Sequence, residues 1–371
     1  MPVTGSASSA ANTVVTGGGQ VYLTNDDYIG EQRVYALNGA TGVSLWSQDL
    51  GSMTNQSPAA YANGHVYIES VDRNANYVFT DLSAATGASL KTYSLAAQFY
   101  PVSQPVAANG LMVAEAGDNN VWPTGFSTTS SMTYLWSVTP SDNGVSGFET
   151  PAMDSTYLYN YTGSALDVFT VADGKLAFTI GDPAAITPVP VRGEYNGAPM
   201  IGAQHDIITY TGTDDSASPQ PSGEGRGSGR YLSSFDLNAR KVSWKTSGIY
   251  YTTPAMANGV IYAARNTPAS ELDAISETDG HVLWSWTPPA GETFQRNTIV
   301  TNNLVFVSTN ANIYAIDLTS HAKVWSFGTP GALSMGADLL GVMHLYIVED
   351  VYSPVIEGQL ATGTVVAVRL Q

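Results

Sequence analysis

Two small groups of polar residues have side chains that could do chemistry. His205 and Asp206 are adjacent at the start of a long polar segment, and Asp215 follows within it. A histidine beside a carboxylate is a combination that transfers protons near neutral pH. His205, Asp206 and Asp215 are therefore the candidate catalytic residues, and a tolerated surface insertion is the competing interpretation.

The second group has the residue types of a cation site. Asp72, Asn74 and Asn76 alternate along the chain, as the first three oxygen ligands of a calcium loop do. Tyr77 stands where such a loop needs glycine, and no glutamate occupies its last ligand position. Asp72, Asn74 and Asn76 are the candidate metal ligands, while a solvated Asx turn is the favoured interpretation.

The sequence lacks the motifs of several large enzyme classes. It has no cysteine, which excludes disulfides, thiolate metal sites and cysteine nucleophiles. No G-x-S-x-G, H-E-x-x-H or Walker pattern occurs, and no helical pattern follows the glycine-rich segment 223–229 to hold a phosphate. These absences favour a protein that is not an enzyme.

The charge and composition of the chain limit which partners it can bind and where it can be located. The 371 residues include 31 acidic and 14 basic ones, which gives a net charge of −17. Such a surface repels nucleic acids and anionic membranes, and no apolar run reaches the ~20 residues of a membrane-spanning helix. The start of the chain, rich in serine and alanine, is typical of a mature secreted protein. We expect an acidic, extracytoplasmic protein: secreted, periplasmic or at the cell surface.

A repeated hairpin supplies the elements that position these residues. In segment 33–48, alternating apolar residues lead into a turn at 38–42 and then into a short strand with Trp46. The hairpin recurs along the chain, and repetition on this scale indicates a repeat fold. Its second strand carries an aromatic residue or, once, a lysine: Trp46, Lys91, Trp136, Phe178, Trp244, Trp284 and Trp325.

A second series of apolar residues precedes the hairpins and extends to the end of the chain. Its members are Tyr22, Tyr67, Met112, Tyr159, Ile201, Tyr262, Phe306 and Tyr346. Short segments of small residues stand just ahead of most of them. Each unit therefore predicts four antiparallel strands, A to D in chain order: a small strand A, a strand B with the apolar marker, and the hairpin of strands C and D.

Four-stranded units at periods of ~40–45 residues predict an all-β, eight-bladed β-propeller. It occupies residues 1–371 as a single domain. The eighth unit, 336–371, stops after its strand C. Either the N-terminal segment Pro2–Ala11 supplies its outer strand, or the last blade keeps an open edge, and an open edge would favour self-association.

The strand order divides the connections between two faces. The short A–B and C–D turns lie on one face, called here the turn face, and the longer B–C and D–A loops lie on the other, the loop face. Function on repeat scaffolds is usually carried by such loops. We expect a protein or an extracellular ligand to bind the loop face, to which we assign His205 and a flexible insertion at about 206–230.

The hairpin resembles the repeat of the quinoprotein-type, or PQQ-like, β-propellers. Their pattern V-Y-A-L-x-x-x-T-G-x-x-x-W is intact at Val34–Trp46, and degenerate copies stand at Asp273–Trp284 and Ile313–Trp325. In size the chain is similar to the lipoprotein propellers of the outer-membrane β-barrel assembly machinery. The resemblance implies the propeller fold but assigns no site, because the glycine permits a tight turn and the tryptophan packs between blades.

Two kinds of enzyme that contain PQQ-like propellers are relevant to the function of this chain. Quinoprotein alcohol dehydrogenases are longer, and they stack the quinone against a ring formed by adjacent cysteines, which this chain lacks. We therefore expect no PQQ and no other cofactor, with Ca²⁺ as the one candidate ion. Tetrathionate hydrolases of acidophiles keep the propeller without the quinone, and a carboxylate of the loop face could serve as the base.

The sequence favours a non-catalytic, extracytoplasmic scaffold or binding propeller that takes part in protein–protein interaction. A hydrolase resembling the acidophile tetrathionate hydrolases is the alternative. A quinone-dependent dehydrogenase is the third interpretation.

Overall fold

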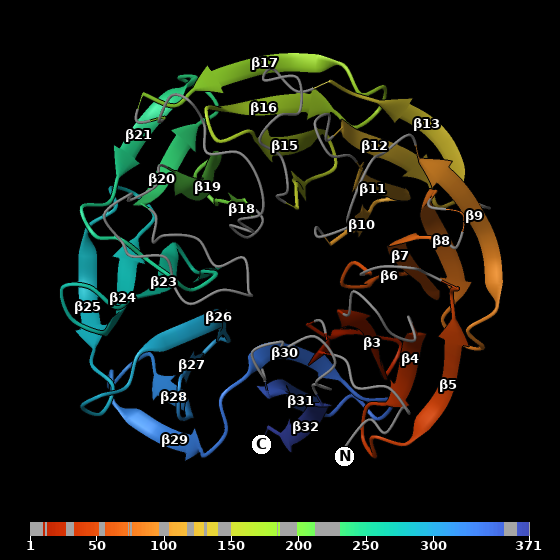
Figure 1. The fold of residues 1–371 in the computed structure, drawn as a ribbon. Helices are drawn as coiled ribbons and strands as arrows, with labels where there is room; N and C mark the ends of the chain where they lie inside the picture. Colours follow the sequence, from red (N-terminus) through yellow and green to blue (C-terminus); the bar gives the residue numbers. More distant parts are fainter. Residues whose placement is uncertain are drawn as a thin grey trace.

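A computed structural model shows eight β-sheets arranged in a ring around a central axis (Figure 1). The structure describes residues 10–11, 13–26, 33–51, 56–72, 74, 76–95, 104–116, 122–129, 132–139, 150–183, 185, 199–211, 231–351 and 362–370. In this part every regular element is a strand, so none of it forms a helix that could cross a membrane. The predicted eight-bladed β-propeller is confirmed.

The strands follow one another blade by blade. Blade one consists of β2 (Val15–Gly17), β3 (Gln20–Asp26), β4 (Arg33–Asn38) and β5 (Ser44–Asp49), and blade two of β6 (Ala60–Ala62), β7 (His65–Val71), β8 (Tyr77–Ser83) and β9 (Ser89–Leu95). Blade three consists of β10 (Val106–Ala108), β11 (Leu111–Ala116), β12 (Trp122–Ser127) and β13 (Thr133–Ser137), and blade four of β14 (Ala152–Met153), β15 (Tyr157–Tyr161), β16 (Ala165–Thr170) and β17 (Leu176–Gly181). Blade five consists of β18 (Met200–Ile201), β19 (Asp206–Thr211), β20 (Tyr231–Asp236) and β21 (Lys241–Lys245), and blade six of β22 (Ala255–Ala257), β23 (Val260–Arg265), β24 (Glu271–Ser276) and β25 (Val282–Trp286). Blade seven consists of β26 (Phe294–Val300), β27 (Leu304–Thr309), β28 (Ile313–Asp317) and β29 (Lys323–Phe327). Blade eight consists of β30 (Ala332–Ala337), β31 (Met343–Val351) and β32 (Thr362–Arg369).

Within each blade the strands pair antiparallel in chain order, with strand A near the axis and strand D at the rim (Figure 1). The Asn-Gly signal of the A–B turns has a structural basis, because Asn63, Asn109 and Asn258 all adopt positive φ there. Asparagine is one of the few residues that tolerate this conformation. The turn chemistry of the sequence thus sets the register of the inner strands.

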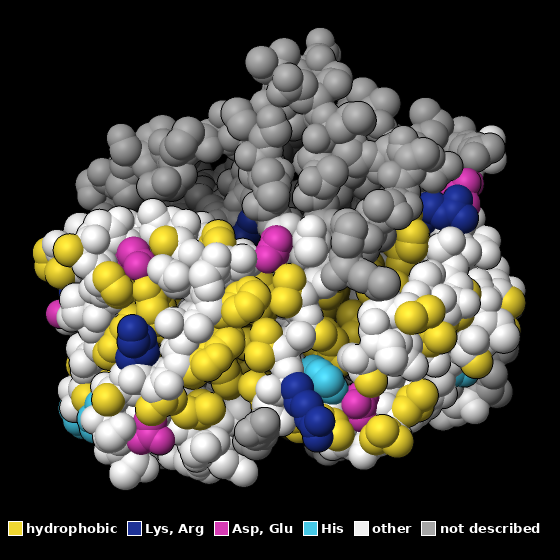
Figure 2. Space-filling view, turned by 90° about the horizontal axis from the view of Figure 1, so that it is seen from below, with side chains coloured by type: hydrophobic (Ala, Val, Ile, Leu, Met, Phe, Trp, Pro, Cys, Tyr) yellow, Lys and Arg dark blue, Asp and Glu magenta, His cyan; other side chains and the backbone are white. Residues whose placement is uncertain are grey.

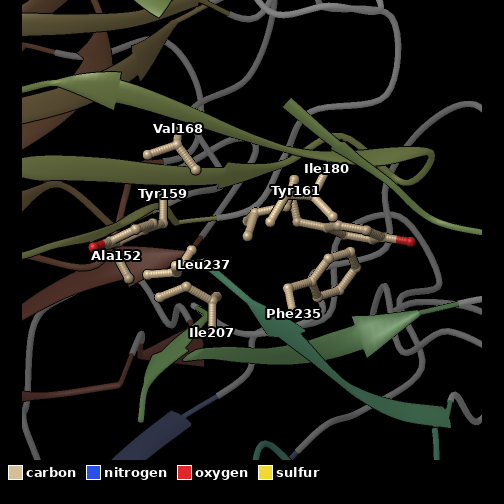
Figure 3. Packing of buried hydrophobic residues seen from close by; sticks show 9 residues of the cluster. Ala152, Tyr159, Tyr161, Val168, Ile180, Ile207, Phe235 and Leu237 are labelled. Atoms are coloured by element: carbon tan, nitrogen blue, oxygen red, sulfur yellow. The ribbon is translucent and has the colours of Figure 1, made fainter. Parts of the chain in front are cut away.

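The core lies between neighbouring blades. Between blades four and five, for example, Tyr159, Tyr161 and Val168 pack against Ile207 and Phe235 (Figure 3). Each sheet therefore buries both of its faces on its neighbours, and the ring is stable although an isolated blade would not be.

Tryptophans of strand D tie one blade to the next. Three of these rings lie against a glycine in the C–D turn of the following blade, and the Nε1–H of each donates to the backbone carbonyl three residues before that glycine. The ring of Trp46 lies on Gly87, that of Trp136 on Gly174 and that of Trp244 on Gly280. The distances from Nε1 to the accepting carbonyl oxygens of Ala84, Val171 and Glu277 are 2.9, 3.1 and 2.8 Å, respectively. Glycine and tryptophan of the repeat are thus two halves of one contact between blades.

Blade five differs from the prediction. Ile201 lies in strand A, β18, and strand B is β19, where Ile208 takes the position expected for Ile201. The sequence assignment rested on the dipeptide Asn196-Gly197, which imitates the A–B turn of other blades, whereas the turn itself lies at 202–205. The assignment of residue 206 to an insertion was also wrong, since β19 extends from Asp206 to Thr211; residues 212–230 lie outside the described residues.

Blade eight has three strands within the part of the chain that the structure describes. β1 (Ala10–Ala11) pairs with the end of β3, next to Asn25 and Asp26, and also lies near β32. The two predicted arrangements of the last blade differ in a segment of which residues 1–9 lie outside the described residues, so the closure of this blade stays a prediction.

Candidate functional site

The candidate calcium ligands lie in the B–C loop of blade two. Oδ1 of Asp72 accepts the backbone N–H groups of Asn74 and Asn76, each at 2.8 Å, and Oδ2 accepts Nδ2 of Asn76 at 3.0 Å. These hydrogen bonds, led by that from the Asn76 side chain, lower the pKa of Asp72. Both carboxylate oxygens are thus engaged in an Asx-type loop, and a cation would have to replace bonds that already exist.

We expect calorimetric titration with Ca²⁺ at millimolar concentration to give no binding heat, because Asp72 makes its hydrogen bonds within its own loop. Asp72→Ala serves as the matched blank. A saturable heat in the parent protein that is lost in Asp72→Ala would establish the calcium site instead.

Two of the three candidate catalytic residues, His205 and Asp206, lie within the described part of the chain. His205 sits at positive φ in the A–B turn of blade five, and therefore on the turn face, which corrects its assignment to the loop face. Asp206 begins β19 and is buried. Asp215 lies outside the described residues. The described part of the chain thus offers no histidine–carboxylate pair at a loop-face mouth.

Instead, Asp206 approaches a second buried carboxyl group, that of Glu277 in the C–D turn of blade six. Ser234 Oγ donates to Oδ2 of Asp206 at 2.7 Å, and the Gln204 backbone N–H donates to Oε1 of Glu277 at 3.0 Å. Gly202 lies between the two carboxyl groups, where a Cβ would collide with both. This cluster joins blades five and six.

Burial is the main cause of the raised pKa of Asp206; the hydrogen bond from the Ser234 hydroxyl lowers this pKa, and the charge of Glu277 raises it. Because Asp206 is 6% exposed and Glu277 1% exposed, the pair has no surface on which a substrate could react. Sequence reasoning singled out Asp206 but missed Glu277, which no local motif marks.

A calcium-bridged quinone does not fit the residues present. The adjacent cysteines that would form its stacking ring are missing from the sequence. Within the described residues, no three His, Asp or Glu side chains are close enough together to hold a metal ion. The donor set of a quinone-dependent dehydrogenase is therefore not assembled in the described structure.

The outer edge of blade eight is the other unusual feature. Strand C is mostly buried in the complete blades, as in β24 and β28, whereas β32 alternates between half-buried and exposed residues from Val366 to Arg369. Figure 2 views the molecule from below Figure 1 and thus towards the rim between β29 and β5; hydrophobic side chains are exposed across this side, with few charged ones among them. β32 is thus less buried than the corresponding strands of the complete blades.

The adjoining turn of blade one lacks the contact made at other joints. Gly42 has a φ of 68°, as the corresponding glycines do, but no described atom lies within 4 Å of where its Cβ would be. The carbonyl of Gly39, three residues earlier, accepts the hydroxyl of Tyr346 at 3.0 Å in place of a tryptophan N–H. Tyr346 thus holds blade eight to blade one, while the surface over Gly42 stays uncovered by described residues.

Comparisons with known proteins agree with this architecture. The model of the family described as "Outer membrane protein assembly factor BamB" matches residues 30–286. A search of the curated proteins gives no match.

Among solved structures, BamB from Moraxella catarrhalis has 14% sequence identity and a TM-score of 0.52, with 78% of this chain and 79% of that chain covered. The quinohemoprotein alcohol dehydrogenase from Comamonas testosteroni has 11% identity and a TM-score of 0.60, with 97% and 74% covered. A europium-containing methanol dehydrogenase has 10% identity and a TM-score of 0.57, with 98% and 85% covered. These structures share the fold with this protein. Because the family model spans more than half of the sequence, the chain belongs to the PQQ-repeat β-propeller family of the outer-membrane assembly factor BamB.

Proposed function

We propose that this protein is a non-catalytic, extracytoplasmic scaffold that binds another protein. The observation that carries the proposal is the match of residues 30–286 to the family model described as "Outer membrane protein assembly factor BamB". The acidic, cysteine-free composition supports a role outside the cytoplasm.

We test the proposal by cross-linking the tagged protein in its source organism, identifying the extracytoplasmic proteins attached to it, and rebuilding the complex from purified components. The expected result is a defined complex with one partner that survives purification. Fractionation of the same cells checks that both proteins lie outside the cytoplasm.

Enzymatic alternatives are tested on the same purified protein. Incubation with tetrathionate at low pH would release thiosulfate and sulfate from a hydrolase, and PQQ with Ca²⁺ would support dye reduction by a dehydrogenase. We expect neither. Turnover in either assay would contradict a purely non-catalytic scaffold.

Self-association through the edge of the last blade remains a prediction of the sequence. Light scattering measures it directly, because pairing between two copies would double the mass of the 39.1 kDa chain. The mass of a single chain would count against self-association.

A further inference from the structure

We infer that the turn face rests on the surface of a phospholipid bilayer, and that the turn between β30 and β31 inserts Leu339 and Leu340 into it. This contact is peripheral; it goes beyond the protein-binding role proposed above and does not depend on it. It requires two leucines that are exposed, held in position and surrounded by a surface that lipid does not repel. The described residues meet each of these conditions.

Leu339 and Leu340 are the most exposed large hydrophobic residues in the described part of the chain. Their exposed fractions are 67% and 85%, and no other such residue there exceeds the 56% of Val324. The tips of the other A–B turns consist of polar residues, glycine or alanine: Gly18-Gly19, Asn63-Gly64, Asn109-Gly110, Ser155-Thr156, Ala203-Gln204-His205, Asn258-Gly259 and Asn302-Asn303. Blade eight thus departs from the other seven blades by placing leucine at this tip.

Asp338 fixes the backbone of this turn. Its Oδ1 accepts the backbone N–H groups of Leu340 at 2.8 Å and of Val342 at 3.0 Å, and its Oδ2 lies 3.1 Å from Nε2 of His344. These hydrogen bonds, led by that from Val342, hold the pKa of Asp338 below its ordinary value, so the carboxylate keeps them at neutral pH. The leucines are therefore presented in one arrangement, and binding need not order the turn.

The tip is also longer than the Asn-Gly turns. The backbone N–H of Asp338 donates to the Val342 carbonyl at 2.9 Å, which leaves three residues at the tip, whereas the A–B turns of blades two, three and six leave two. Leu339 lies on Gly19 of blade one, because a Cβ at Gly19 would be 2.6 Å from Cγ of Leu339. A long, supported tip can enter a soft surface before the neighbouring turns touch it.

The turn face lacks the acidic excess of the whole chain. Ten charged residues in its turns and at the adjoining strand ends are exposed or half-buried, five acidic and five basic: Asp154, Asp173, Asp236, Asp279, Asp317, Lys175, Arg240, Lys241, Lys323 and Arg369. Three further acidic residues there, Asp206, Glu277 and Asp338, are buried. Most of the net charge of −17 therefore lies elsewhere in the chain, and the turn face is close to neutral.

The surroundings of the two leucines carry still less charge. Segments 17–20 and 38–44, which contain the turns of the neighbouring blade one, have no charged residue. At the turn-face end of blade eight, the exposed charged residue among those described is Arg369, which pairs with His344 across the sheet. A guanidinium beside an apolar anchor suits the phosphate groups of lipid headgroups. A neutral, zwitterionic bilayer is thus the surface that matches this region.

The small size of the apolar surface favours lipid over a protein partner or a second copy. A stable interface between proteins buries about 800 Å² on each side, far more than two leucines and the 41% exposed Met343 provide. A bilayer needs no complementary pocket, because apolar side chains enter the boundary between headgroups and acyl chains while their polar neighbours stay among the headgroups. Since two leucines bury less surface than one acyl chain, we expect weak and reversible association.

Flotation with phosphatidylcholine vesicles tests the contact on the full-length protein. We expect a bound fraction that rises with lipid concentration, and a partition coefficient about tenfold lower for Leu340→Ser, since burial of one leucine side chain is worth roughly that factor. Leu135→Ser, which removes a 47% exposed leucine from the rim strand β13, is the matched control and should bind like the parent. The Tm of each variant checks that its fold is intact.

A fluorescent label locates the contact. The chain has no cysteine, so Leu340→Cys and Leu135→Cys each accept one environment-sensitive dye. Vesicles should shift the emission of the dye at position 340 to shorter wavelength and leave that of the dye at position 135 unchanged.

No binding of the parent protein, equal binding of Leu340→Ser, or a dye at position 340 that stays in water while the protein floats with the vesicles would overturn the inference. So would a shift of this dye without vesicles that grows with protein concentration, because a second copy would then cover the leucines. If Leu340→Ser loses a protein partner found by cross-linking in cells while the parent ignores vesicles, the turn is a contact with that protein and the assignment to lipid is wrong. Each of these results leaves the scaffold role to its own test.

Discussion

Gly280→Ala will lower the free energy of unfolding by about 2–4 kcal/mol, from backbone strain at positive φ plus overpacking. Gly280 has a φ of 72°, and a Cβ there would lie 2.5 Å from Cε3 of Trp244. The ring cannot withdraw freely, because its Nε1–H is bonded to the Glu277 carbonyl at 2.8 Å. The added methyl group must therefore push blade five away from blade six.

Gly42→Ala is the matched control for this prediction. Gly42 has nearly the same φ, 68°, but its Cβ would meet no described atom within 4 Å. The substitution should cost about 1 kcal/mol, the cost of positive φ alone. Chemical denaturation and the shift in Tm measure both. Equal losses would mean that the ring of Trp244 yields without cost, or that something covers Gly42 as tightly as Trp244 covers Gly280.

The contrast between these two glycines also explains how much of the fold the sequence could predict. The T-G and Trp pattern repeats because each pair is one contact between blades, so the repeat alone predicts the ring and its order. Ile201 was misplaced because blade five substitutes both markers: its strand B has Ile208 instead of an aromatic residue, and its A–B turn has His205 instead of Asn-Gly. Where a blade lacks the marker residues of the repeat, a similar short sequence nearby can be mistaken for them.

The candidate sites were less predictable, for a physical reason. Asp206 owes its raised pKa to burial and to Glu277, which is distant in sequence and lies in the next blade. No spacing rule connects two positions that only ring closure brings together.

The carboxyl pair leads to the second large effect, a dependence of stability on pH that Asp206→Asn removes. The pKa of Asp206 is raised above its ordinary value of 3.8 by burial and by Glu277, so the folded protein holds this proton more tightly than the unfolded chain does. Its contribution to stability is therefore complete below pH 3.8 and is lost as the pH rises through the raised pKa.

Asparagine at position 206 keeps the shape and can still accept the Ser234 hydroxyl, while its amide can donate to the Glu277 carboxylate. We expect Asp206→Asn to be about 1–2 kcal/mol more stable than the parent at pH 7, because a hydrogen bond replaces a buried repulsion. In acid, where Asp206 is already protonated in the parent, the difference should disappear. Denaturation curves between pH 3 and pH 8 measure the difference.

Asp317→Asn provides the control of opposite sign. Asp317 lies in an exposed C–D turn, and the backbone N–H of Ser320 holds its pKa below the ordinary value. Such a carboxylate stabilises the fold at neutral pH and loses that effect as the pH falls. Asp317→Asn should therefore lower stability at pH 7, where Asp206→Asn raises it. If both substitutions shifted stability in the same direction at pH 7, the pKa of Asp206 would not be raised in the folded protein.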